Sequence, residues 1–76
     1  MDIAAEVDAR GLNCPLPILR AKKALAALQS GQLLRVLTTD AHAREDFVAF
    51  TSQTGHALVE QRDEEGGVTA HVLRRR

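Results

Sequence analysis

The two prolines of this 76-residue chain, Pro15 and Pro17, lie next to its only cysteine, Cys14. Proline disrupts the interior of a helix but is tolerated in the first turn, where its missing N–H would have no helical partner. An apolar and basic run follows directly, at residues 18–28. The pattern predicts a loop that becomes a helix here, with Asn13 or Cys14 as the N-cap and Pro15 as the first helical residue.

Helical periodicity appears in two stretches. In residues 18–28, apolar side chains recur at spacings of three and four, which predicts a buried face made of Ile18, Ala21, Leu25 and Leu28. Gly31 is expected to end this helix with a left-handed cap. In residues 43–54, Phe47 and Phe50 are the only aromatic residues of the chain, and we expect them to supply much of the core. Gly55 is expected to end this second helix.

Four short stretches have the composition of strands. Residues 3–9 alternate in a period of two, which predicts a strand with one face inward. Residues 33–38 are mostly apolar and predict the central strand of a sheet. Residues 57–62 and 68–73 are separated by a charged turn whose length suits a hairpin.

The predicted element order is therefore β-α-β-α-β-β. Two helices and four strands bury their apolar faces most economically as two layers. We expect an α+β fold, a two-layer sandwich with both helices on one face of a four-stranded sheet, formed by a single domain over residues 1–76. The first crossover should be right-handed.

Charge and cysteine content exclude several classes of protein. Ten acidic and ten basic residues cancel, so no global field directs the chain to nucleic acid or to a membrane. One cysteine allows no internal disulfide, which favours a reducing compartment. The first residues resemble no signal peptide, and no apolar run approaches the ~20 residues that a membrane span needs. We expect a cytoplasmic protein, with a monomer as the simplest state.

Cys14 is the leading candidate for chemistry. A helix start places partial positive charge near the sulfur, and Arg10 and Arg20 are expected to add to it, which predicts a lowered thiol pKa. The competing interpretation is a buried cysteine that acts as a small hydrophobic side chain. A position between two elements favours the surface, because loops lie there.

Several kinds of cysteine chemistry fit poorly. Dithiol redox chemistry needs a second cysteine, which is absent from the sequence. A cysteine-dependent enzyme needs a base and a cleft, and although His42, His56 and His71 are candidate bases, the chain is short for a cleft. Transfer of a sulfur atom needs only the thiolate. A regulatory or protein-interaction module without sulfur chemistry, and a small cysteine-dependent enzyme, remain as alternatives.

The histidines and basic residues have plainer interpretations. No histidine pair has the spacing of a zinc motif, so we expect neither a metal nor another cofactor. His71 is expected at a strand surface or edge, and His56 in a loop with a backbone hydrogen bond. The Arg74 to Arg76 tail could touch RNA phosphates, but the absence of exposed aromatic residues and the zero net charge argue against direct nucleic-acid binding.

The helix that follows Cys14 carries three further cations. A docking patch for an acidic partner surface could be formed by Arg20, Lys22 and Lys23. We expect Arg10 to bind the partner as well. A solvated helix face is an equally good interpretation.

Residues 7–17, with Gly11, Leu12, Pro15 and Pro17 around Cys14, resemble the opening signature of the TusA/SirA-like family of small sulfur-carrier proteins. Residues 22–25, 32–38, 46–47 and 55–56 also resemble the family pattern, so that nearly the whole chain is covered. The resemblance implies a β-α-β-α-β-β sandwich with a mixed sheet. It also implies that Cys14 accepts sulfur as a persulfide, typically from a cysteine desulfurase or another persulfide donor.

In that family the sulfur passes to a downstream sulfur-accepting protein, for tRNA 2-thiouridine synthesis, sulfur oxidation or cofactor sulfuration. The resemblance thus implies a sulfur-relay protein and not an enzyme that turns over alone. Asp40 matches an acidic position associated with partner contact. The turn reads Thr39-Asp40-Ala41, whereas family members often have two acidic or amide residues followed by proline.

Overall fold

The computed structural model describes residues 1–76 and contains the predicted elements in the predicted order. They are β1 (Ile3–Ala9), α1 (Leu16–Ala26), β2 (Leu33–Thr38), α2 (Ala43–Thr54), β3 (Ala57–Asp63) and β4 (Thr69–Arg74), with a short 3₁₀ turn, η1 (Glu65–Gly67), between the last two strands. Neither α-helix has the length and apolar composition that crossing a bilayer requires.

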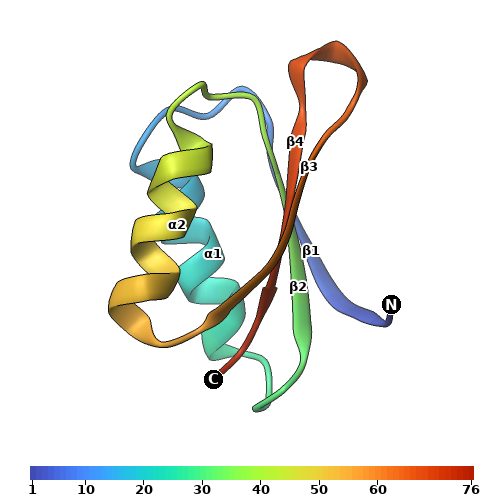
Figure 1. Ribbon diagram of the computed structural model, residues 1–76, viewed down its shortest axis with the longest axis vertical. Helices are drawn as coiled ribbons and strands as arrows, with labels where there is room; N and C mark the ends of the chain where they lie inside the picture. The colour runs from blue at the N-terminus through green and yellow to red at the C-terminus, as the bar shows by residue number, and fades with distance from the viewer.

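The sheet has the strand order β1-β2-β4-β3. β1 pairs with β2 in parallel, and the β2–β4 and β4–β3 pairs are antiparallel. Both helices cover one face of this sheet, and the other face is open (Figure 1). The predicted α+β two-layer sandwich with a mixed four-stranded sheet is confirmed.

The core lies between the helices and the two interior strands. β2 buries Leu34, Val36 and Thr38 toward the helices, which confirms its central position. Phe47 of α2 is fully buried, and Phe50 packs against it with an edge-to-face ring contact. Gly55 ends α2 as predicted, in the left-handed conformation at φ 84°.

Both ends of α1 differ from the prediction. The helix begins at Leu16, with Pro15 in the N-cap position and no side-chain cap, so neither Asn13 nor Cys14 caps it. It ends at Ala26, before Gly31, because the next N–H groups bond to carbonyls three residues back and tighten the chain into a turn. Gly31 keeps a positive φ of 88° but lies in the following loop.

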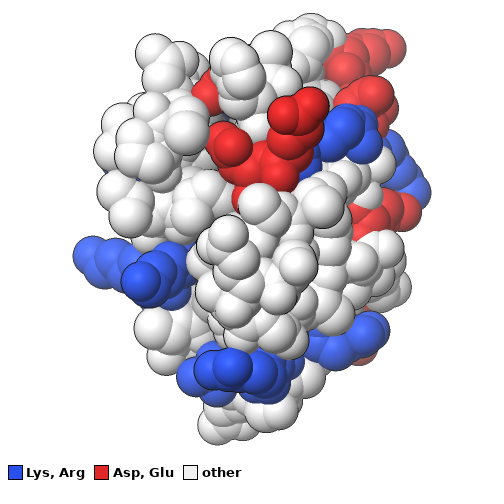
Figure 2. Space-filling view, turned by 60° about the vertical axis from the view of Figure 1, so that its left-hand side comes forward, with Lys and Arg blue, Asp and Glu red and all other residues white.

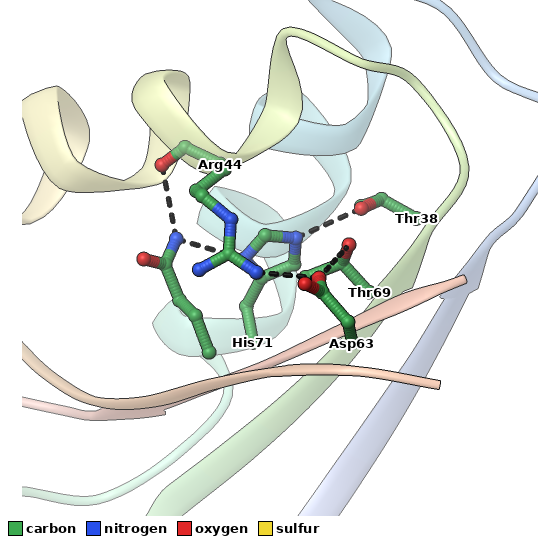
Figure 3. A network of polar contacts seen from close by, with 6 residues as sticks. Thr38, Arg44, Asp63, Thr69 and His71 are labelled. Atoms are coloured by element: carbon green, nitrogen blue, oxygen red, sulfur yellow. Dashed lines mark hydrogen bonds and ion pairs between the residues drawn. The ribbon is translucent and has the colours of Figure 1, made fainter. Parts of the chain in front are cut away.

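The prediction for His71 was wrong. Its side chain is fully buried, because β4 lies between β2 and β3 and is not an edge strand. The imidazole stacks on Phe47 at 4.5 Å between ring centroids, and it contacts Thr38 and Gln61 through its two ring nitrogens (Figure 3). His56 was predicted correctly, since its Nδ1 accepts the backbone N–H of Arg76 at 3.0 Å.

Candidate functional site

Cys14 lies in the loop between β1 and α1 and is exposed. The loop leaves β1 in a tight turn, in which Leu12 N–H donates to the Ala9 carbonyl at 3.2 Å. Gly11 has a φ of 78°, which favours glycine at this position. The turn into α1 is closed by Leu16 N–H, which donates to the Asn13 carbonyl at 2.9 Å. The Cys14–Pro15 peptide bond is cis.

The Cys14 loop is bonded to the turn between β2 and α2. The backbone N–H of Cys14 donates to Oδ2 of Asp40 at 2.8 Å, and the N–H of Gly11 donates to Oγ1 of Thr39 at 2.8 Å. Because β1 and β2 are parallel neighbours, their carboxyl ends bring these two segments together. The position of the Cys14 backbone therefore depends on residues far along the chain.

Asp40 is engaged within the chain. Its Oδ1 accepts the backbone N–H of His42 at 3.1 Å and lies 3.3 Å from the Nδ1 of the same residue. Its side chain is only 11% exposed. The hydrogen bonds from the backbone N–H groups of His42 and Cys14 hold the pKa of Asp40 below its ordinary value. The partner contact expected of Asp40 remains a prediction, but an internal role is evident.

The predicted lowering of the Cys14 pKa was wrong. A hydrogen bond to the Asp46 carboxylate raises the pKa of the Cys14 thiol, and burial and the charges of Asp46 and Asp40 raise it further. The helix adds little to oppose them, because it begins two residues after Cys14 and neither Pro15 nor Pro17 has an N–H group. The nearby charge is acidic and not basic.

Asp46 is the site residue that the sequence reasoning missed. It lies in the first turn of α2 with Glu45, and no ion pair involves either residue. Figure 2 looks onto the helices and shows acidic side chains gathered toward the end of the molecule where α2 begins. The available signal was the topology, since two helices that follow adjacent parallel strands begin at the same end of the sheet.

The four cations predicted near Cys14 are not among the groups that act on its thiol. Arg10 forms two hydrogen bonds of 2.8 Å with Asp8, and this exposed ion pair lowers the pKa of Asp8 to about 2. Arg20, Lys22 and Lys23 are exposed on α1, and no ion pair involves them. None of these residues accounts for the pKa of Cys14.

Cys14 is not in a cleft. The two hollows of the surface are lined by other residues. Of the candidate bases, His42 faces Asp40, His56 bonds to the C-terminal backbone and His71 is buried. Exposed leucines lie close by in the sequence, with Leu16 46% and Leu19 53% exposed. An exposed thiol beside exposed apolar side chains suits contact with another protein.

Known proteins resemble this chain over most of its length. A family model described as "Sulfurtransferase TusA" matches residues 5–75. "Sulfur carrier protein TusA" of Allochromatium vinosum is 57% identical over 65 residues, which are 86% of each chain. "Sulfur carrier protein TusA" of Pseudomonas aeruginosa is 42% identical over 64 residues, 84% of this chain and 81% of the other.

A solved structure has a similar fold. The SirA-like protein of Desulfitobacterium hafniense superposes with a TM-score of 0.83 at 31% identity, over 92% of this chain and 95% of the other. The agreement extends over both helices and the sheet, since nearly the whole chain is covered. The family match and the two relatives confirm the predicted resemblance: the chain belongs to the TusA family.

Proposed function

We propose that the protein is a sulfur carrier in which Cys14 accepts sulfur as a persulfide from a cysteine desulfurase or another persulfide donor. The observation that supports the proposal most directly is an exposed thiol whose backbone is fixed by Asp40 at 2.8 Å but which lies in no cleft. Relatives at 57% and 42% identity bear the name sulfur carrier. A sulfur that must meet two partners in turn needs this kind of open position.

The transfer step is a balanced exchange. The sulfur of Cys14 attacks the terminal sulfur of the donor persulfide, R–S–SH, a new S–S bond forms, and the S–S bond of the donor breaks. The proton of the Cys14 thiol goes to the donor sulfur, which leaves as R–SH, and Cys14 becomes Cys14–S–SH. An acceptor thiol then takes the terminal sulfur in the same way, and there is no net oxidation or reduction.

Because the thiol pKa is raised in the free protein, a partner that lowers it would activate the thiol. The thiolate is the nucleophile, and in the free carrier Asp46 favours the protonated thiol. A cation of the partner placed against Asp46 would offset this charge and lower the thiol pKa. The carrier would then react mainly when docked, as expected of a sulfur-relay protein that does not turn over alone.

The docking surface would combine apolar and basic residues of α1. Leu16 and Leu19 are exposed beside the Cys14 loop, and Lys22 is an exposed cation of the same helix. We expect a cytoplasmic monomer that delivers sulfur to a downstream sulfur-accepting protein. Synthesis of tRNA 2-thiouridine, sulfur oxidation and cofactor sulfuration are the candidate destinations.

Intact-mass spectrometry tests the proposal. The protein is incubated with a cysteine desulfurase and cysteine, and we expect a gain of one sulfur atom that dithiothreitol removes. Cys14→Ser should show no gain under the same conditions. An unmodified wild-type protein, or the same adduct on Cys14→Ser, would contradict the proposal and favour a regulatory module without sulfur chemistry.

A further inference from the structure

A groove of about 580 Å³ lies between β1 and α1, away from Cys14. Its apolar lining residues are Val7 from the strand and Ala24 and Ala27 from the helix. Cys14 is not among its lining residues. The groove is therefore a feature separate from the sulfur site, and both could be occupied at once.

The groove includes the free edge of the sheet. β1 is the outer strand and pairs only with β2. Glu6 and Asp8 alternate with Val7 along β1. The two acidic side chains therefore point to one face of the sheet and Val7 to the other, yet all three line the groove. The groove thus extends around the edge of β1, where the backbone groups that do not face β2 are available. An extended peptide can add a strand at such an edge.

The acidic residues of the groove are already paired within the chain. Glu6 forms an ion pair with Arg35 at 3.1 Å, and Asp8 forms one with Arg10 at 2.8 Å. Both arginines lie outside the set of residues that line the groove. The two carboxylates therefore add little net negative charge to it.

The basic residues of the groove are unpaired. Arg20 and Lys23 line it from α1, and neither takes part in an ion pair. They are three residues apart, roughly 4.5 Å along the helix axis. Alternate residues of an extended strand lie about 6.6 Å apart on one face, a separation that the long arginine and lysine side chains can accommodate. Charge complementarity therefore favours an occupant with acidic residues at alternate positions.

We propose that this groove binds an extended acidic segment of a partner protein, which adds a strand to β1 and places its acidic side chains against Arg20 and Lys23. The intervening side chains of the same segment would point to the opposite face of the sheet, beside Glu6 and Asp8. Binding here does not require a persulfide, so Cys14→Ser should bind as the wild type does. Failure of sulfur loading and failure of this contact can therefore be told apart.

Peptide titration followed by ¹H–¹⁵N NMR tests the proposal. The probe is an acetylated and amidated peptide of alternating valine and aspartate, and its counterpart has lysine in place of aspartate. We expect the acidic peptide to shift the amides of Ile3–Ala9 and to slow their hydrogen exchange. R20E/K23E should weaken binding by about tenfold or more, because two attractions become repulsions.

The control variant is R74E/R76E, which makes the same change of charge at exposed arginines outside the groove. Because salt screens charges that lie far from the bound peptide, this variant should alter the affinity for the acidic peptide by less than about twofold. Equal binding of the lysine peptide, equal loss of affinity in the control variant, or shifts confined to β3 would overturn the proposal. Concentration-dependent shifts of β1 without peptide would indicate a second copy as the occupant and would also overturn it.

Discussion

The backbone N–H of Cys14 donates to the carboxylate of Asp40 at 2.8 Å, across 26 residues of sequence. Asp40 also accepts the N–H of His42, and its side chain is almost wholly covered. The loop that presents the sulfur is thus fixed by the turn that begins α2. Asp40 acts on Cys14 by holding its backbone, whether or not it also touches a partner.

Replacing Asp40 separates its geometric role from its charge. Asp40→Ala should lower the free energy of unfolding by about 1–3 kcal/mol, since two backbone N–H groups lose their acceptor. Asp40→Asn keeps an acceptor oxygen, so its free energy of unfolding should fall by less. Urea denaturation measures the change in stability, and the rate of persulfide loading measures how well the Cys14 loop is positioned. Equal stability and equal loading in both variants would show that the hydrogen bond to Cys14 has no such role.

Removing the charge of Asp46 should activate the thiol of the free protein. Asp46→Asn is expected to lower the pKa of Cys14 and to raise its alkylation rate by iodoacetamide at pH 7 several-fold, because Asp46 is the main cause of the raised pKa. Glu45→Gln is the matched control, as a neighbouring acid that does not contribute to that pKa. A wild-type thiol pKa below the ordinary value of about 8.5 would contradict this account.

The burial of His71 predicts a loss of stability in mild acid. Burial and the positive charge of Arg44 lower the pKa of His71 to about 4, while Asp63 opposes this shift. The unfolded chain has an ordinary pKa of about 6.5, so between these values it binds more protons than the folded protein. Stability should therefore be complete above pH ~6.5 and decline toward pH ~4, by at most about 3 kcal/mol.

Denaturation with urea from pH 7 to pH 4 measures this effect. Carboxylates with lowered pKa values, such as Asp63, also make the protein less stable as the pH falls. The wild type is therefore compared with His71→Gln, which isolates the contribution of the histidine. The variant should be less stable at pH 7 but show a shallower decline. Parallel curves for the two proteins would exclude His71 as the cause.

The hydrogen bonds around His71 assign its tautomer. Gln61 Nε2 donates to the Arg44 carbonyl at 2.9 Å and lies 3.1 Å from Nδ1 of His71, which must then accept. The proton is therefore on Nε2, which donates to Oγ1 of Thr38 at 2.8 Å (Figure 3).

Thr38→Val should consequently destabilise the fold by about 1–3 kcal/mol, since it leaves a buried N–H unpaired. Thr51→Val is a matched control, because the Thr51 hydroxyl bonds only to carbonyls of its own helix. It should cost less than Thr38→Val in the same denaturation experiment. A larger effect at Thr51 would show that the hydrogen bond between Thr38 and His71 does not have this role in stability.

Most of the fold was predictable because its signals are local. The spacing of apolar residues indicated each helix and strand, and Gly55 marked the end of α2. Predictions about the surroundings of single residues failed, as for the pKa of the Cys14 thiol and the burial of His71. A histidine in an alternating stretch looks exposed until strand pairing puts β4 inside the sheet.

The sequence by itself determined the order of elements, the family, and the place of Cys14 between a strand and a helix, since these depend on residues close together in the chain. Only the tertiary structure decided the surroundings of the sulfur. The parallel pairing of β1 and β2 brings Asp40 and the first turn of α2 to the Cys14 loop. A helix start predicts a lowered thiol pKa, but the Asp46 carboxylate raises the pKa of the Cys14 thiol instead.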